Sequence, residues 1–126
     1  MMLEISRAAL DAIRTAAAES PDAEVCGLLL GEGLRVERVV ACRNVADDQA
    51  RAFEIDPQAL IAAHRAARNG GPAVIGHYHS HPNGKAEPSA RDAAAAHGGG
   101  VWLIAGGSEV SAWLALDGGR FERLEC

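Results

Sequence analysis

The chain has 126 residues, the size of one ordinary domain, and we expect residues 1–126 to form a single domain. Hydrophobic residues make up 48% and charged residues 23%, which is enough apolar material for a core and excludes disorder as the default expectation. The net charge of −5 and an aromatic content of 4% argue against nucleic-acid binding, which needs a basic surface and aromatic stacking platforms.

The first half of the chain predicts a helix, a hairpin and a second helix. Apolar residues three and four apart predict a helix over residues 6–19, with a serine as its N-cap. Residues 24–30 form an apolar run and residues 34–42 alternate in polarity, which is typical of two strands joined by a tight turn. A short edge strand is expected at residues 53–55. An Asp-Pro pair then begins a helix over residues 56–68.

The second half predicts four more strands. A central strand is expected over residues 73–80, two more over 101–105 and 109–116, and a last strand over 121–124. A short helix is expected to open at Pro88-Ser89. Strands that alternate with helices indicate an α/β domain in which helices pack on a sheet.

The cysteine content and the N-terminal residues predict a cytoplasmic protein without a membrane partner. Cys26, Cys42 and Cys126 form no C-x-x-C pair, and a secreted disulfide-stabilised domain of this size would carry more cysteines. Charged residues such as Glu4 and Arg7 interrupt any apolar core of a signal peptide. No apolar run reaches the roughly 18 residues needed to cross a bilayer.

The segment from His77 to Asp92 carries the residues best suited to chemistry. His79 and His81 are two apart in a strand, so both imidazoles point to one face, about 6.6 Å apart along it. His77 lies on the same face, so strand geometry alone allows either neighbouring pair. With Asp92, two imidazoles and one carboxylate would leave zinc an open fourth position, as in catalytic sites.

Each of these features also has an ordinary structural explanation. An H-x-H pair at the end of a strand is more often surface chemistry than a metal site. Ser89-x-x-Asp92 before a run of alanines is a typical helix capping box. Their joint occurrence at this spacing favours a metal site.

The combined pattern resembles the JAMM (MPN+, Mov34/PAD-1-like) zinc metalloproteases of the small prokaryotic type. The matching residues are His79-Ser80-His81-Pro82, then Ser89-Ala90-Arg91-Asp92 after seven intervening residues from His81. Glu24, followed by an apolar run with Gly27, matches the remaining element of the signature. The resemblance extends over essentially the whole chain and implies an MPN (cytidine-deaminase-like) fold, a mixed central sheet flanked by helices.

The resemblance implies a zinc-dependent peptidase or isopeptidase. By position, His79, His81 and Asp92 would bind Zn2+, Glu24 would be the general acid/base, and Ser89 would help to stabilise the oxyanion. The implied substrate is a ubiquitin-like protein with an extended C-terminal Gly-Gly tail. Only eight residues separate Asp92 from Val101, which leaves little room for the second insertion of eukaryotic deubiquitinases. The resemblance is therefore to the small prokaryotic members, and it implies small sulfur-carrier proteins as substrates.

Several residues and functions remain open. Without the resemblance, Glu24 would be explained as an exposed strand end, although a buried carboxylate would need a partner. His77 is expected in core packing or beside the ligands, and Cys26 as a small buried residue. His64 and His97 are expected at the surface. The alternative functions are a non-catalytic MPN-type interaction module and a RadC-like repair accessory. A nucleobase deaminase would need an H-x-E motif that is absent.

Overall fold

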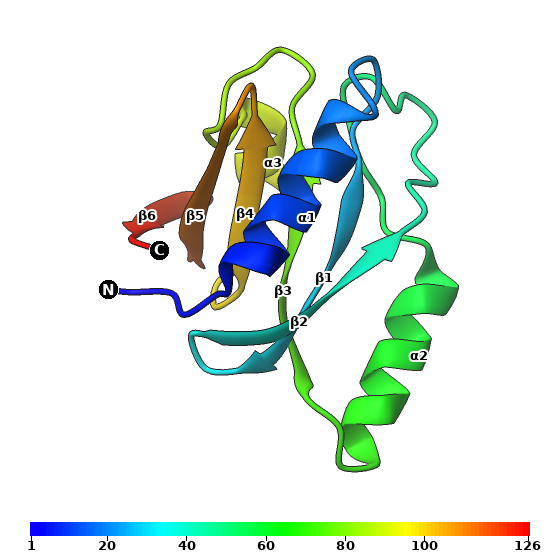
Figure 1. Ribbon diagram of the computed structural model, residues 1–126, viewed down its shortest axis with the longest axis vertical. Helices are drawn as coiled ribbons and strands as arrows, with labels where there is room; N and C mark the ends of the chain where they lie inside the picture. The colour runs from blue at the N-terminus through cyan, green and yellow to red at the C-terminus, as the bar shows by residue number, and fades with distance from the viewer.

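The computed structural model describes all residues from 1 to 126. In chain order its elements are α1 (Arg7–Ala18), β1 (Cys26–Glu32), β2 (Arg35–Cys42), α2 (Pro57–Arg68), β3 (Ala73–Ser80), α3 (Ala90–Ala95), β4 (Val101–Gly106), β5 (Glu109–Leu116) and β6 (Arg120–Leu124). The strands form one six-stranded sheet in the order β2-β1-β3-β4-β5-β6. Only β3 and β4 run parallel, so the sheet is mixed, and the expected α/β class is confirmed (Figure 1).

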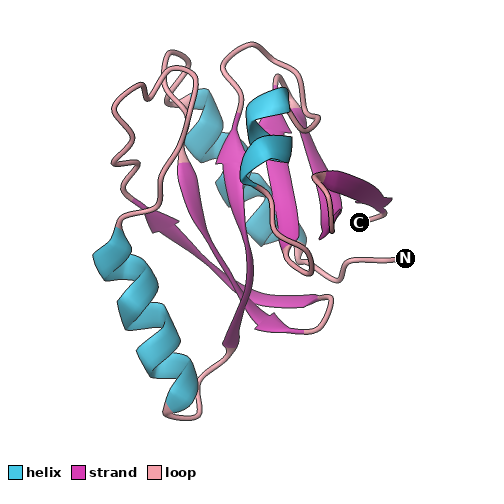
Figure 2. Ribbon diagram, turned by 180° about the vertical axis from the view of Figure 1, so that it is seen from behind, coloured by secondary structure: helices cyan, strands magenta, loops and turns pink.

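The helices cover the sheet unequally. Helix α1 crosses one face and contacts β4 and β5, with Ile13 buried in the main core (Figure 1). Leu29, Tyr78 and Leu103 meet Ile13 there from neighbouring strands. Helix α2 lies beside β3 and has no buried residue, and α3 lies on the face opposite α1 (Figure 2). The predicted functional residues of β3 point to that second face.

Local hydrogen bonds account for the ends of the predicted helices. The Ser6 hydroxyl accepts from the Ala9 amide at 3.1 Å, and the Asp56 carboxylate accepts from the Gln58 amide at 3.0 Å. These bonds satisfy amides that have no partner within the helix. Both expected N-caps are therefore confirmed.

Two expectations about strands are wrong. Residues 53–55 form no strand but one isolated bridge, between Asn44 and Ile55, because the Glu54 amide donates to the Asn44 side chain instead of to a neighbouring strand. Strand β1 begins at Cys26, not at Glu24, because the Glu24 amide donates to the Gln49 carbonyl and not into the sheet. Glu24 therefore lies in the loop that leads into β1.

Strand β3 is the centre of the sheet and sets the position of the histidines. His79 is opposite Cys26 in β1 and opposite Ile104 in β4. One residue earlier, the Tyr78 ring packs directly over Gly27 of β1, where a Cβ atom would overlap the ring. This close approach of two strands explains why a glycine follows Glu24 so closely.

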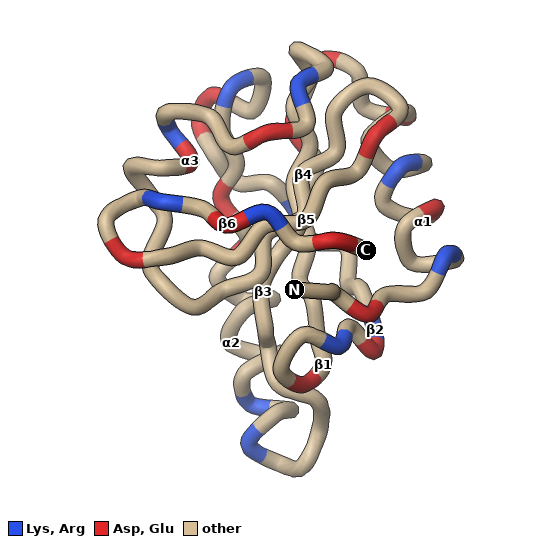
Figure 3. The backbone as a smooth tube through the Cα atoms, turned by 90° about the vertical axis from the view of Figure 1, so that its left-hand side faces the viewer, with Lys and Arg blue, Asp and Glu red and all other residues tan.

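The two chain termini lie close together, and the charged residues are spread over the molecule (Figure 3). The termini lie side by side, joined by a bridge between Met2 and Glu125 (Figure 3). Acidic and basic residues are interspersed over the tube in that view, without one dominant basic face. None of the helices combines the length and the apolar character that a membrane span requires.

Candidate metal centre

Three side chains from β3, the following turn and α3 converge on one point. His79 Nε2 lies 3.1 Å from His81 Nε2 and 3.3 Å from Asp92 Oδ2, and His81 Nε2 lies 3.1 Å from the same oxygen. Tetrahedral zinc with bonds of 2.0–2.2 Å holds its ligand atoms about 3.3 Å apart. The three donor atoms therefore form a triangle of the size that fits a zinc ion.

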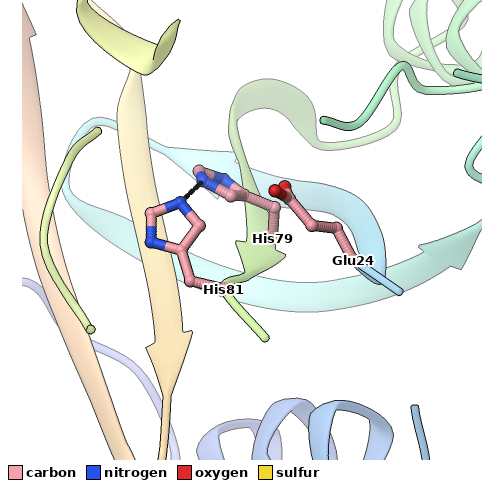
Figure 4. Close-up of side chains that lie close together, drawn as sticks. All are labelled: Glu24, His79 and His81. Atoms are coloured by element: carbon pink, nitrogen blue, oxygen red, sulfur yellow. Dashed lines mark hydrogen bonds between the residues drawn. The ribbon is translucent and has the colours of Figure 1, made fainter. Parts of the chain in front are cut away.

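Glu24 lies close to this triangle. Its carboxylate and the ring nitrogens of His79 and His81 lie within 4.8 Å of one another. In Figure 4 the carboxylate points toward the His79 ring. Asp92 is at ligand–ligand distance from both histidines, whereas Glu24 is a looser neighbour. The spacing of a zinc ligand is therefore met more closely by Asp92 than by Glu24.

All four groups are buried. Their exposed fractions are 7% for Glu24, 0% for His79, 7% for His81 and 6% for Asp92. Buried ionisable groups are costly unless they are paired or bind an ion. A cation at the centre of the triangle would give them a common partner.

The turn after β3 determines the tautomer of His81. Pro82 has no amide hydrogen for the sheet, and the chain turns back so that the Gly84 amide donates to the His81 carbonyl at 3.0 Å. The Lys85 carbonyl then lies 2.8 Å from His81 Nδ1. A carbonyl can only accept, so Nδ1 is protonated, and in the neutral ring Nε2 is the nitrogen whose lone pair a metal would bind. Without a metal, a protonated Nε2 can instead donate to the Asp92 carboxylate.

Helix α3 begins with a complete capping box. The Ser89 hydroxyl accepts from the Asp92 amide at 3.0 Å, and Asp92 Oδ2 accepts from the Ser89 amide at 2.9 Å. The same Oδ2 faces both histidines. Ser89 and Asp92 can therefore form a capping box and a metal site at the same time. The cap holds the Asp92 carboxylate in the orientation that a metal ligand needs.

His79 is held by aromatic packing and not by a second hydrogen bond. Its Nδ1 is buried without a partner, and the Phe53 ring stacks on the imidazole at 4.3 Å between centroids. Trp102 presents its edge at 5.6 Å. His77 lies outside the triangle and packs on Trp102 at 4.3 Å, in agreement with the expected packing role.

The surroundings shift the pKa values of the four groups. Burial lowers the pKa of His79. Burial also lowers the pKa of His81. The hydrogen bonds of the His81 ring to Asp92 and to the Lys85 carbonyl outweigh this effect, so the pKa of His81 is raised overall. For Asp92, burial is outweighed by the hydrogen bonds from His79 and His81, which hold the pKa well below its usual range. The lowered pKa favours the anionic form of Asp92, which is the form that binds metal.

Burial raises the pKa of Glu24 to about 7, against an opposing effect of His81. A carboxyl group that titrates near neutral pH can both accept and return a proton. Glu24 lines a pocket of about 380 Å³ together with His81 and Ser89, and Arg51 borders the same pocket.

The structure thus brings all five predicted site residues to one place. Their side chains come from sequence positions as far apart as 24 and 92. His64 and His97 are exposed, and Cys26 is buried, as expected. Sequence reasoning did not identify Asn44 and Phe53 as parts of the site. No motif marks these two residues, because a polar loop residue and a lone aromatic carry no spacing signal.

A family comparison agrees with this geometry. A mixed sheet with two histidines, an aspartate and a nearby glutamate at the end of its central strands defines a JAB/MPN-type domain. Residues 6–116 match the family model of prokaryotic homologs of the JAB domain. The chain belongs to that family, and the resemblance to small prokaryotic JAMM/MPN+ proteins is confirmed.

Two named relatives are similar in sequence. The chain is 34% identical over 118 residues to a probable TtuB-protein conjugate cleaving protease of Thermus thermophilus, covering 94% of this chain and 79% of that protein. It is 38% identical over 81 residues to the desampylase of Haloferax volcanii, covering 63% of this chain. That match spans 58% of the length of the desampylase.

Solved structures share the fold. A solution structure of a protein from Desulfitobacterium hafniense has a TM-score of 0.81 and 27% identity, covering 98% of this chain and 90% of that one. A JAB1/MPN domain protein from Archaeoglobus fulgidus has a TM-score of 0.60 at 21% identity, covering 98% and 94%. The second likeness is one of fold, and it confirms the expected MPN architecture.

Proposed function

We propose that this chain is a zinc-dependent hydrolase that cleaves a peptide or isopeptide bond at the C-terminal tail of a ubiquitin-like, sulfur-carrier type of protein. One observation carries the proposal: Glu24 and Ser89 line the same pocket as His81, whose Nε2 lies beside His79 and Asp92. The relatives named as a desampylase and a TtuB-conjugate protease support the substrate class.

His79, His81 and Asp92 are the proposed ligands of the metal. Their donor atoms have the spacing of a tetrahedral site, and only three protein ligands meet there, which leaves a position for substrate or water. Zinc, when bound, supplies a Lewis acid that polarises a carbonyl and makes water a stronger acid.

Glu24 and Ser89 are the proposed catalytic residues. The Glu24 carboxylate takes the proton of the attacking water and later delivers it to the leaving amine. The Ser89 hydroxyl oxygen already accepts a hydrogen bond from the Asp92 amide. The hydroxyl proton remains free to donate to the oxyanion that forms on the substrate. Both residues therefore act in the same pocket.

The proposed partner presents an extended tail that ends in Gly-Gly. Such a tail has no side chains at the scissile bond and fits a narrow approach to a buried centre. The three cysteines are all free, which agrees with a reducing compartment, and we place the reaction in the cytoplasm.

The test uses a purified ubiquitin-like sulfur carrier joined through its terminal glycine to a lysine side chain, and the same carrier with a short C-terminal extension. The zinc-loaded wild type is expected to release the carrier from at least one of them, as followed by mass spectrometry. Glu24→Gln should keep one zinc per chain but lose about 10²–10⁴ in rate, as expected for lost acid–base catalysis.

His81→Ala is the matched metal variant. It should lose both zinc, measured by elemental analysis, and cleavage. Equal zinc in the wild type and in His81→Ala would move the metal site elsewhere. Binding of the carrier without cleavage of either substrate would instead favour a non-catalytic interaction module.

A further inference from the structure

Glu24 lies outside the strand ladder, so other contacts must hold it. Its amide donates to the Gln49 carbonyl at 2.7 Å, and its carbonyl accepts from the Asn44 side-chain amide at 3.0 Å. On the other side, the Val25 amide donates to the Ser80 hydroxyl at 2.9 Å. Ser80 lies between His79 and His81, so one anchor of this segment comes from the histidine strand and the other from the loop 43–56.

Asn44 is the residue that closes this loop. Its Nδ2 donates to the carbonyls of Glu24 and Ala52, and its Oδ1 accepts from the amides of Ala46 and Glu54, each at 3.0 Å. A side-chain amide has two donor hydrogens and two acceptor lone pairs, so every hydrogen-bonding position of this half-buried side chain is used. Neither a carboxylate nor a hydroxyl can make the same four bonds.

The same loop also reaches the metal centre at its far end. Phe53 stacks on the His79 ring, and its chain neighbours Ala52 and Glu54 both bond to the Asn44 side chain. The Asn44 side chain thereby joins the backbone of Glu24 to the segment that covers His79. The Asn44 side chain therefore links Glu24, the proposed base, to the segment around Phe53, which packs on the proposed ligand His79.

We infer that Asn44 is a positioning residue that sets the distance between the Glu24 carboxylate and the centre formed by His79 and His81. The inference rests on the proposed function of Glu24 as the base. Asn44 touches neither substrate nor reacting atoms, and it acts through the Glu24 backbone. Because a displacement of about 1 Å can lower a rate by roughly 10²-fold, loss of this anchor is expected to reduce turnover.

The variant Asn44→Asp tests the inference, because it keeps the shape and the acceptor oxygen but removes both donated bonds. Asn69→Asp at the end of α2 is the control, with the same change of charge at an exposed position. We expect Asn44→Asp to keep one zinc per chain, to lose about 10–100-fold in kcat with little change in KM, and to exchange the Glu24 and Val25 amide hydrogens faster. Asn69→Asp should resemble the wild type in all of these.

A double variant separates positioning from general loss of structure. If Asn44 acts through Glu24, adding Asn44→Asp to Glu24→Gln should slow the reaction no further. Multiplied losses, or unchanged kcat and amide exchange in Asn44→Asp, would overturn the inference. If Asn44→Asp does not fold, Asn44→Ala takes its place without the added charge. If the wild type cleaves nothing, the proposed function fails, and amide exchange alone decides whether Asn44 anchors Glu24.

Discussion

Asp92 is part of the capping box of α3 and is also a proposed metal ligand. One carboxylate oxygen accepts a hydrogen bond from the Ser89 amide and also faces the two histidines. Because the capping box holds the side chain before any metal arrives, little further ordering is needed on binding. A motif that is ordinary at a helix start therefore also orients a proposed ligand.

Ser89 caps α3 and is also the proposed oxyanion donor, and a pair of substitutions separates the two roles. Removing its cap should cost about 1 kcal/mol in Ser89→Ala but only a few tenths in Ser89→Gly, since glycine is tolerated at N-caps. Loss of an oxyanion donor should lower the rate about 10²–10³-fold in both. Calorimetry, zinc content and kcat measure these effects. A Ser89→Gly variant with wild-type stability and full activity would make Ser89 a cap only.

At the scale of elements, the close pairing of β1 and β3 brings Glu24 next to the histidine strand. The Tyr78 ring occupies the space where a side chain at position 27 would lie, and the Val40 carbonyl approaches from β2. The three strands therefore pack at a distance that only glycine permits at this position.

Gly27→Ala is expected to destabilise the protein by about 1–3 kcal/mol, because the added methyl group overpacks a rigid ring and a backbone carbonyl. Chemical denaturation measures the change. Gly100→Ala is the matched control, since a Cβ there meets nothing within 4 Å and its φ is not in the left-handed region. Equal stabilities of the two variants would contradict the packing argument.

At the scale of the whole molecule, the centre links β3 to α3, and Glu24 approaches it from the segment before β1. A bound metal would therefore stabilise the folded state as a whole, because the unfolded chain does not hold its ligands together. The free-energy gain is about 2.7 kcal/mol when free zinc is 100 times the Kd.

Chelation of the purified protein should accordingly lower Tm by roughly 10 °C for a domain of this size. Differential scanning calorimetry with and without a chelator measures the shift, and added zinc should reverse it. His79→Ala serves as the control, because a variant without the site should not respond to the chelator. The same shift in that variant would mean that the chelator acts elsewhere.

Local patterns were sufficient to predict most elements. Ser6 and Asp56 are caps whose partners lie two or three residues away, and the apolar spacing of the helices repeats over a few residues. The failed strand at residues 53–55 shows the limit of this reasoning. Its apolar residues suit a strand, but the Glu54 amide bonds to the side chain of Asn44, ten residues away.

By itself, the sequence determined the helix caps and the alternation of helices and strands, which depend on neighbours close along the chain. The five site residues followed from a family resemblance that joins Glu24 to the segment from His79 to Asp92. Strand geometry alone left His77 and His81 as equal partners for His79; the motif resemblance implied His81, and the tertiary structure gives the physical reason. In the turn after Pro82, the Lys85 carbonyl accepts a hydrogen bond from Nδ1 of His81, so Nε2 of that ring faces Asp92. Helix α3 places the Asp92 carboxylate beside His79 and His81 and not beside His77. The anchoring of Glu24 by Asn44 was likewise decided in three dimensions. Contacts across strands and loops depend on register and turn conformation, which no local spacing encodes.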